Sequence, residues 1–507
     1  GGNLTISEPV NIAGDGVGSG GAIRNVAGSN TLTGGVVLSA ASRLNSDAGN
    51  MTVSTGGVSG AFDLTVGGIG NTTIASAITT GTGGLTKDGT GTLTLSGSSN
   101  NFTGAVNLSR GTTTISSLGN AGANSSLGAG TSAIVVGGSN AATLSYVGSN
   151  TTSNRSLTVG GTGGATLQLT GSNQTLNLTG TVDGSAGNLS IDAGTNSLAI
   201  SGNGNTLGTT SIASGNNITL RSASLTLAAS TVSGILDARA TGNLTVSGTQ
   251  SVTGAVTLVA DGTLALNGNI STSASGNAIT LVGNTAFSRN GNASLGMGVG
   301  GRWVIYSADP DQDTFNGLAS GNTAVWNATF AGNPPSGIAA GNRYVFSISP
   351  TLTYTSTDLT KTYGDDATAS LASAYSVSGL RGNLGGAVVA DTLAAVVSGT
   401  PSVSSSGAAA GANVAGSPYA ITISAGNLSA GSGYGLAYSS TGQLTVNKAA
   451  LTVTADDKSK TYGAADPTLS YTVNATQLKN SDTAAVVSNI SLTAPTNASA
   501  TAGTHTI

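Results

Sequence analysis

The chain has 507 residues, of which only 7% are charged, and it holds 79 glycines, one histidine and no cysteine. Without cysteine it has no disulfide framework, thiol nucleophile or cysteine-ligated zinc. Its 16 basic residues are scattered and form no cluster of the kind that binds nucleic acid or anionic lipid. Thr, Ser, Val, Asn and Gly outnumber the good helix formers, so the composition predicts an all-β fold. No apolar run approaches the roughly 20 residues of a membrane-spanning helix.

The two ends of the sequence carry no recognisable signals. It begins with Gly1, its first methionine is Met51, and no basic segment followed by an apolar one opens it. We therefore expect the sequence to be an excerpt, with any secretion signal, export domain or cell anchor outside it.

Residues 1–300 are predicted to form a right-handed parallel β-helix. Short segments in which Thr or Ser alternates with apolar residues, bounded by Gly, Asn or Ser, recur along this region, for example at Gly2–Ser7, Gly91–Ser96, Gly187–Asp192 and Gly242–Ser247. This alternation is typical of β-strands, and no amphipathic helices separate the segments as a parallel α/β sheet would require. With roughly 20 to 25 residues per coil, the region is expected to hold about 12 to 15 stacked coils.

Residues 301–350 are predicted to be an aromatic-rich capping or transition segment. The first 300 residues hold four aromatic residues, whereas the remaining 207 hold 15, including Trp303, Trp326, Tyr344 and Phe346. Large side chains at this place would seal the exposed end of a solenoid. An aromatic site that stacks on sugars is the alternative.

The tail is predicted to contain two tandem modules, at 351–448 and 449–507. Leu352–Gly364 and Leu451–Gly463 match at eight of 13 positions with a spacing of 99 residues, and both end in Lys-Thr-Tyr-Gly. The module length and its short strands predict small immunoglobulin-like β-sandwiches, with one helical turn within 474–487. The second module is expected to be truncated, because His505–Ile507 aligns with Tyr419–Ile423, and to expose a sheet edge.

Three stretches resemble parts of the filamentous-haemagglutinin-like exoproteins and autotransporter passengers of Gram-negative bacteria. Gly83–Ser117 resembles the autotransporter-associated β-strand repeat, and Gly301–Phe346 is similar to the segment between solenoid and tail in such proteins. The two Lys-Thr-Tyr-Gly copies resemble stalk modules of the YDG and MBG types. The resemblance implies a secreted or outer-membrane-associated adhesin that attaches to host or environmental glycans or proteins. It also implies an outer-membrane transporter or barrel outside this sequence, without specifying a receptor or an export route.

No catalytic, cofactor-binding or metal-binding residue is predicted, and no cofactor is expected. Asp309, Asp311 and Asp313 stand at alternate positions, as at the start of a calcium loop. However, Thr314 and Ser320 occupy the places of the loop glycine and the bidentate glutamate. A solvated turn is therefore expected.

Two motif types carry little weight. The pattern G-x-G-x-x-G occurs at Gly16–Gly21 and Gly296–Gly301, but neither copy opens a helix after a buried strand, as dinucleotide binding requires. A Ser–His–Asp arrangement would have to depend on His505, the single histidine.

Two alternatives to the non-enzymatic adhesin stay open. A carbohydrate-active β-helix enzyme, lyase or hydrolase, would need acids and bases converging on one face. Residues 1–300 hold nine acids and eight bases, and Lys87–Asp88 and Asp237 with Arg239 are expected to be turn or strand-end pairs. Rows of Thr-x-Thr would order water as ice-binding proteins do, but their spacing along the sequence is too irregular to predict a regular array.

Overall fold

The computed structural model describes residues 3–494 and 503–504. It divides into two compact units. The first comprises Gly1–Ile348 with Gly382–Ala390, and the second comprises Ser349–Arg381 with Asp391–Ile507. About 6% of the chain is helical, so the prediction of an all-β protein is confirmed.

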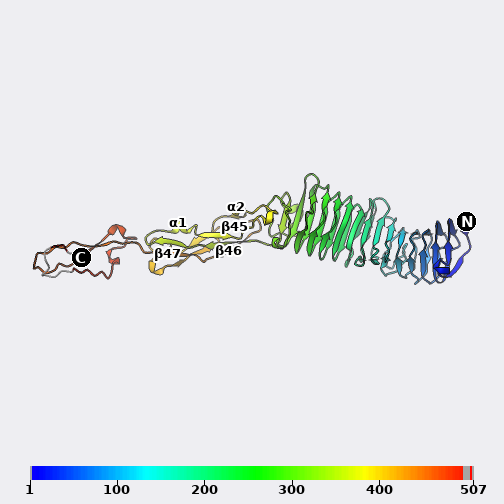
Figure 1. The fold of residues 1–507 in the computed structure, drawn as a ribbon, viewed down its shortest axis with the longest axis horizontal. Helices are drawn as coiled ribbons and strands as arrows, with labels where there is room; N and C mark the ends of the chain where they lie inside the picture. The colour runs from blue at the N-terminus through cyan, green and yellow to red at the C-terminus, as the bar shows by residue number, and fades with distance from the viewer. Residues whose placement is uncertain (1–2, 495–502, 505–507) are drawn as a thin grey trace. The chain divides into compact units, whose positions relative to one another are not determined.

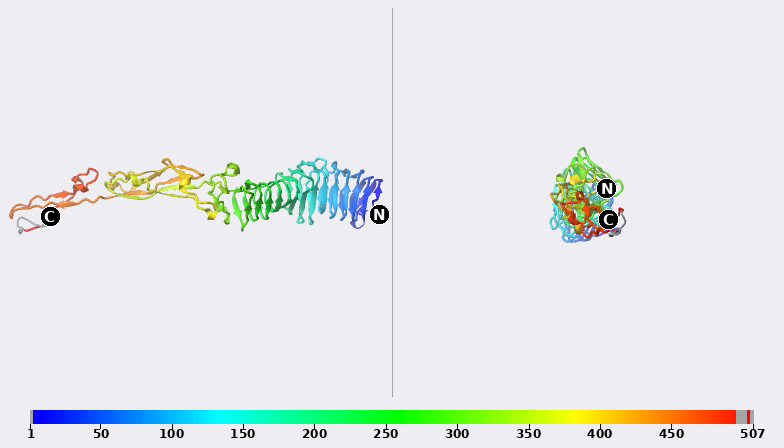
Figure 2. Two further views of the ribbon diagram at one scale, coloured as in Figure 1. Left: turned by 90° about the horizontal axis from the view of Figure 1, so that it is seen from above. Right: turned by 90° about the vertical axis from the view of Figure 1, so that its left-hand side faces the viewer.

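The first unit is a parallel β-solenoid of about 14 turns, which confirms the predicted fold class and coil number. Its coils are the stacked blue-to-green strands of Figure 1, and Figure 2 shows the same stack from two other sides. Among the described residues, three parallel sheets run along the stack. The largest has 17 strands: β1 (Thr5–Ile6), β4 (Ser29–Leu32), β6 (Asn50–Val53), β9 (Asn71–Ile74), β12 (Thr92–Leu95), β14 (Gly111–Ile115), β16 (Ala142–Tyr146), β19 (Ala165–Leu169), β22 (Leu189–Asp192), β24 (Gly208–Ser214), β26 (Leu225–Val232), β28 (Leu244–Val246), β29 (Gln250–Val252), β31 (Thr263–Leu266), β32 (Ile270–Thr272), β34 (Ala286–Arg289) and β35 (Leu295–Gly296).

The other two sheets form the remaining sides of the coils. The 11-stranded sheet contains β2 (Val10–Gly14), β3 (Ile23–Asn25), β5 (Val36–Ser46), β7 (Val58–Ser59), β8 (Leu64–Gly67), β10 (Ile78–Thr79), β11 (Leu85–Lys87), β13 (Val106–Leu108), β15 (Ile134–Val136), β18 (Leu157–Val159) and β21 (Val182–Asp183). The nine-stranded sheet contains β17 (Thr151–Ser153), β20 (Thr175–Leu178), β23 (Ser197–Ile200), β25 (Ile218–Ser222), β27 (Leu236–Ala240), β30 (Val256–Ala260), β33 (Gly276–Gly283), β36 (Gly301–Ser307) and β37 (Arg343–Phe346). Short 3-10 turns η1 (Val17–Ser19), η2 (Pro310–Gln312), η3 (Pro335–Gly337) and η4 (Leu384–Gly386) also belong to this unit.

The alternating sequence pattern explains how each strand builds the core. In β12, Leu93 and Leu95 are buried while Thr92 and Thr94 lie on the outer side. Successive side chains of a strand point to opposite faces, and parallel pairing stacks Leu95 between the equivalent positions of β9 and β14. The core is therefore a set of columns of small apolar side chains, one layer per coil.

The aromatic-rich segment continues the solenoid instead of starting a separate body. Strand β36 pairs in parallel with β33, and β37 pairs with β36. The segment 382–390 also belongs to this unit, because Ser320 N donates to Ala387 O at 2.8 Å and Val389 N donates to Asn322 O at 2.9 Å. The last coils thus have the same parallel pairing as the first.

The second unit contains several small sheets. Its elements up to residue 447 are β38 (Thr351–Ser356), β39 (Leu359–Thr362), α1 (Thr368–Leu371), β40 (Tyr375–Ser378), α2 (Leu393–Val396), β41 (Val397–Ser398), β42 (Ser402–Ser404), η5 (Val414–Gly416), β43 (Tyr419–Ala420), β44 (Thr422–Ser424), β45 (Ser429–Ala430), β46 (Gly435–Ser439) and β47 (Gln443–Asn447). Figure 1 labels α1, α2 and β45 to β47. Strand β38 pairs antiparallel with β40 and parallel with β46, and β47 pairs parallel with β39 and antiparallel with β43. The pairing is therefore mixed, and β41 with β45 and β42 with β44 form small antiparallel sheets.

The second Lys-Thr-Tyr-Gly copy lies in a sparser environment than the first. After it come β49 (Tyr471–Val473), which pairs antiparallel with β48 (Val453–Ala455), and the 3-10 turns η6 (Ala475–Gln477) and η7 (Ala484–Val486). These turns confirm the helical turn predicted within 474–487. Tyr363 packs against a buried apolar cluster that includes Leu444 and Val446 of β47, whereas Tyr462 is 77% exposed.

Candidate functional site

Several charged side chains of the solenoid form ion pairs. Arg24 contacts Asp47 at 2.6 Å. Asp237 contacts both Arg221, at 2.7 Å, and Arg239, at 3.2 Å. The expected strand-end pair of Asp237 and Arg239 is therefore present, with Arg221 from the preceding coil added. Acids placed in this way balance neighbouring guanidinium groups and do not converge on a shared reaction point.

Another ion pair joins two residues that lie two coils apart along the 11-stranded sheet. Arg43 in β5 donates to both carboxylate oxygens of Asp88, with Nη1–Oδ2 2.7 Å and Nη2–Oδ1 2.9 Å. The guanidinium lies above Gly67 in β8, where an added Cβ would approach Nη2 to 1.9 Å. Glycine at position 67 therefore leaves the space that this bidentate contact occupies.

Lys87 occupies a strand end, as expected, but its side chain is buried. It lies at the end of β11 and is 2% exposed. Its Nζ donates to the backbone carbonyls of Gly89 and Arg110. Burial lowers the pKa of the Lys87 ammonium to about 8, partly offset by the charge of Asp88. The carbonyl contacts give this lysine a structural role, since it ties its turn to the next coil.

The three aspartates 309, 311 and 313 do not gather around a common point. Asp309 caps η2 by accepting from the backbone N of Asp311 at 3.0 Å. Asp313 turns inward, where its Oδ1 accepts from Phe287 N and from Ser307 Oγ, each at 2.7 Å. The prediction of a solvated turn therefore holds for the first two acids and is wrong for Asp313. Within the described residues, no group of three or more acidic or histidine side chains is placed to hold a metal ion.

The environment of Asp313 makes this region sensitive to pH. Burial raises the pKa of the Asp313 carboxyl to about 6, although the bonds from Ser307 and Phe287 oppose the shift. Its Oδ2 is buried without a hydrogen-bond partner among the described residues. A protonated carboxyl carries no charge to desolvate, so the folded state binds this proton more tightly than the unfolded chain does.

We therefore expect acidification to stabilise the last coils of the solenoid. A folded-state pKa of about 6 lies above the ordinary value of 3.8, so the contribution is complete below pH 3.8 and is lost as the pH rises through 6. Between pH 7 and about pH 4.5 the gain in unfolding free energy is about 1–3 kcal/mol. This gain can be measured by hydrogen exchange of β36 and β37 between pH 7 and about pH 4.5. Asp313→Asn should remove this pH dependence of the unfolding free energy, and the exposed Asp311→Asn should keep it. An unchanged pH dependence in Asp313→Asn would contradict its assignment to the Asp313 carboxyl.

The aromatic residues after position 300 form a buried cluster. Tyr344 and Phe346 are fully buried, and Trp303 and Trp326 are almost so. Tyr344 makes edge-on contacts with Trp303, at a centroid distance of 4.9 Å, and with Phe315, at 4.8 Å. Because the Trp303, Trp326, Tyr344 and Phe346 rings face one another and the solenoid core, their faces are not available to stack on a sugar. The sugar-stacking alternative therefore does not fit these four residues.

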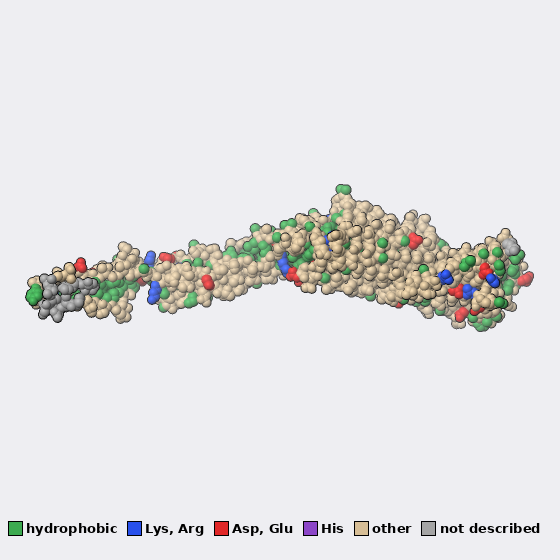
Figure 3. All heavy atoms as spheres, viewed as in Figure 1, with side chains coloured by type: hydrophobic (Ala, Val, Ile, Leu, Met, Phe, Trp, Pro, Cys, Tyr) green, Lys and Arg blue, Asp and Glu red, His purple; other side chains and the backbone are tan. Residues whose placement is uncertain are grey.

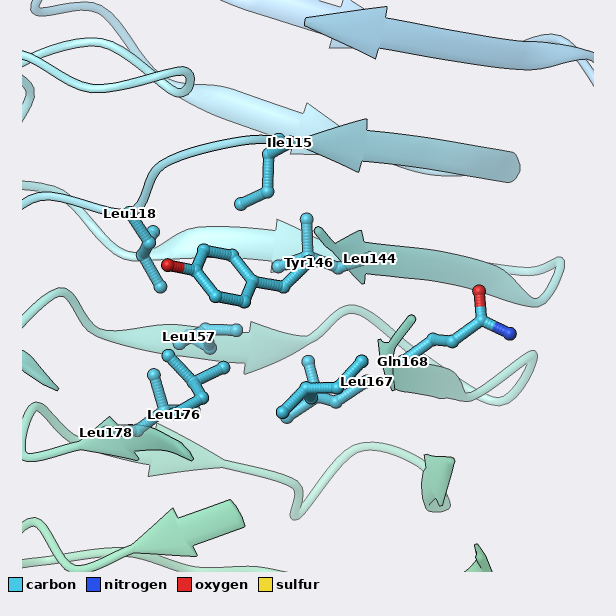
Figure 4. A pocket seen from close by; sticks show the side chains of 10 residues that line it. Ile115, Leu118, Leu144, Tyr146, Leu157, Leu167, Gln168, Leu176 and Leu178 are labelled. Atoms are coloured by element: carbon cyan, nitrogen blue, oxygen red, sulfur yellow. The ribbon is translucent and has the colours of Figure 1, made fainter. Parts of the chain in front are cut away.

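A small apolar cavity lies between coils in the middle of the solenoid. Figure 4 shows the Tyr146 ring among the leucines that line it, while Gln168 points away from the ring. The cavity holds about 10 Å³, which is at the lower limit for one water molecule, and an apolar cavity of this kind stays dry. It is a packing defect and not a ligand site.

The remaining candidate motifs are placed as follows. Gly16–Gly21 surrounds the 3-10 turn η1, and Gly296–Gly301 connects β35 to β36, so neither G-x-G-x-x-G copy opens an α-helix. His505 lies outside the described residues. Over the part of the chain that the structure describes, no helix is both long and apolar enough to span a membrane.

The outer surface of the solenoid is mostly polar and uncharged. On the face seen in Figure 3, charged side chains gather over the coils near the N-terminus, and few interrupt the middle of the stack. The outward positions of the 17-stranded sheet are largely Thr, Ser and Asn, as β6, β9, β12 and β14 illustrate. A surface of this composition offers many weak hydrogen-bonding groups and little electrostatic attraction. This composition was predictable from the sequence, whereas its alignment was not, because the fold sets the pairing between coils.

Two family models match parts of the chain. Residues 85–115, which span β11 to β14, match the passenger-associated-transport-repeat. Residues 451–507 match the MBG domain of the YGX type. No curated protein and no solved structure matches the chain significantly. Together with the β-solenoid, the two matches confirm the resemblance to an autotransporter passenger with MBG modules.

Proposed function

We propose that this chain is part of a non-enzymatic adhesin-like exoprotein that is secreted or displayed on the bacterial surface. The observation that carries the proposal is the long run of stacked coils whose outward side chains are neutral hydroxyls and amides. Such a surface binds through many weak contacts, and repetition along the coils supplies avidity. The passenger-associated-transport-repeat at 85–115 supports export through an outer-membrane transporter.

The proposed organisation assigns one role to each part of the chain. Residues 1–300 are the presenting solenoid, residues 301–350 cap it, and residues 351–448 and 449–507 are stalk modules. The MBG match at 451–507 supports the stalk assignment. In this arrangement the expected partners are glycans or proteins of a host or environmental surface.

We expect adhesion by this chain to depend little on salt. The charged fraction is 7% and the formal net charge is −4, and the solenoid acids Asp47, Asp88 and Asp237 are already paired with arginines. Raising NaCl from about 10 to 150 mM shortens the Debye length from about 30 to 8 Å and screens any surface attraction between charges. Retention of the purified chain on cells or glycan-coated surfaces should therefore change by less than about twofold across this range.

Two results would contradict the proposed function. The first is a loss of most binding between low and physiological salt, which would indicate an electrostatic mechanism. The second is release of reducing sugar or unsaturated product from a panel of polysaccharides that is abolished by a single Asp substitution. That result would make the chain a carbohydrate-active enzyme.

A further inference from the structure

One face of the 17-stranded sheet carries two aligned rows of polar side chains, here called the hydroxyl array. In the first row, successive coils place a threonine directly opposite a threonine. This row consists of Thr5, Thr31, Thr52, Thr73, Thr94 and Thr114. The second row lies two residues earlier on the same strands and consists of Ser29, Asn50, Asn71, Thr92, Thr112, Thr143, Thr166 and Ser190.

These residues are unevenly spaced in the sequence, but strand pairing places them directly opposite one another in the fold. Consecutive members of the first row are 26, 21, 21, 21 and 20 residues apart, yet no register shift occurs between β1 and β14. Turns of different length take up the extra residues. The expectation that irregular spacing prevents a regular array is therefore wrong for this face. The first row ends at Thr114 in β14, and the second row ends at Ser190 in β22, beside the register shift after Ile191.

The side chains of the array are available to solvent. In β12 the neighbours Leu93 and Leu95 are fully buried, so Thr92 and Thr94 between them face outward. Within the described residues, the hydroxyls of Thr94 and Thr114 make no hydrogen bond to another protein group. Thr52 accepts from Asn50 Nδ2 at 3.0 Å along the same face. Thr73 Oγ1 donates to Asn50 Oδ1 at 3.5 Å, and Asn71 Oδ1 accepts from Thr92 N at 2.9 Å. The remaining hydrogen-bonding capacity of the array, including the hydroxyls of Thr94 and Thr114, is directed to water.

The dimensions of the array resemble those of a tetrahedral water network. Neighbouring strands lie about 4.8 Å apart, and side chains two residues apart on one face are separated by about 6.6 Å. Water oxygens about 2.75 Å apart in tetrahedral order have second neighbours at about 4.5 Å and repeat at about 7.3 Å along the perpendicular axis. The mismatch is about 0.3 Å per coil, or about 1.5 Å over five coil steps, and about 0.7 Å between the two rows. Each of these is less than one oxygen–oxygen distance.

We propose that the hydroxyl array binds ice. Threonine hydroxyls at fixed repeats hold first-layer water molecules in positions that a growing ice surface continues, and the methyl groups between them restrict other arrangements of that water. No charged side chain lies in the two rows from β1 to β19, so no strongly hydrated group imposes a competing water structure. The inference goes beyond the adhesin proposal, because it assigns one face of the same outward surface to a different binding partner.

Ice fits this face better than a sugar polymer does. Sites for neutral ligands rely heavily on aromatic and apolar surface with a few polar groups. The array contains no aromatic residue. Of the four aromatics in residues 1–300, Phe102, Tyr146 and Phe287 are buried, and the exposed Phe62 lies between β7 and β8, outside the strands of the array.

Inhibition of ice recrystallisation and shaping of ice crystals test the proposal on the full chain. The unmodified chain should show both activities. Thr73→Tyr and Thr94→Tyr, which place a bulky ring on the array without touching the core, should abolish them. Thr86→Tyr is the matched control, because its row on the 11-stranded sheet reads Arg43, Thr65, Thr86, Asn107 and Val135 and is not a hydroxyl row. Thr94→Val, which keeps the shape and removes one hydroxyl, should lower the activity while leaving the circular dichroism spectrum unchanged.

Three results would overturn the proposal. One is a folded, unmodified chain without effect on ice growth. Another is equal loss of activity in Thr86→Tyr and Thr94→Tyr. The third is loss of binding to neutral polysaccharide particles in Thr94→Tyr with activity on ice unchanged, which would assign the array to a glycan.

Discussion

Replacing Tyr344 with alanine is expected to destabilise the last coils of the solenoid by about 3–5 kcal/mol, the cost of removing a large buried aromatic side chain. The Tyr344 ring is fully buried and contacts Trp303, Phe315 and Phe346. Its hydroxyl donates to Leu318 O at 2.8 Å. In a solenoid each coil contacts only its neighbours, so the effect should stay local. Hydrogen exchange of β36 and β37 should accelerate about 10²- to 4 × 10³-fold, while β12 stays protected.

Two variants separate the contribution of the ring from other effects. Tyr344→Phe keeps the ring and loses only the bond to Leu318, which should cost about 1 kcal/mol. Tyr462→Ala removes a tyrosine that is 77% exposed and should change little. If Tyr344→Ala were no more harmful than Tyr344→Phe, the aromatic cluster would not be what closes the stack.

Replacing Lys361 with methionine is expected to destabilise the first stalk module by about 3–5 kcal/mol, because several buried carbonyls lose a charged donor. Lys361 is 7% exposed. Its Nζ donates to the backbone carbonyls of Asp365, at 3.1 Å, Ala408, at 3.2 Å, and Ala409. Methionine has a similar length without the ammonium, so it tests the hydrogen bonds and not the volume. Hydrogen exchange of β39 and β47 measures the loss.

The second copy of the motif offers a matched control. Lys460 also bonds to the carbonyl four residues later, that of Ala464, at 3.5 Å, and it pairs with the half-exposed Asp466. The exposed ion pair contributes only about 0–1 kcal/mol, so Lys460→Met should be far milder than Lys361→Met. If Lys361→Met and Lys460→Met lost equal stability, burial of the carbonyls around Lys361 would not be the cause of its destabilisation.

The Lys-Thr-Tyr-Gly motif now has a physical explanation. In both copies the lysine ammonium group donates to the backbone carbonyl four residues later. The glycine adopts a positive φ, +96° at Gly364 and +83° at Gly463, which favours glycine over other residues. The motif therefore encodes a tight turn closed by an ammonium group, and the repeat could be recognised from the sequence although the contact that it makes could not.

Strand positions and faces were predictable from local pattern. In β12, the order Thr92, Leu93, Thr94, Leu95 is enough to predict a half-buried strand, because a period of two matches the pleat. Tyr344 and Trp303 were likewise predicted as a cap from their concentration after residue 300. Asp313 and Lys87 escaped prediction, since each depends on which atoms of a different coil lie beside it.

The sequence by itself determined the class of this protein: an all-β solenoid with repeated small modules, poor in charge and similar to autotransporter passengers. The fold class follows from composition, alternation and repetition, which act over a few neighbouring residues, whereas the similarity rests on the repeat at 85–115 and the module at 451–507. Only the tertiary structure decided which side chains from separate coils stand together. Turns of unequal length bring Thr73, Thr94 and Thr114 into one row, because hydrogen bonding between parallel strands sets the register while the loops absorb the difference in length.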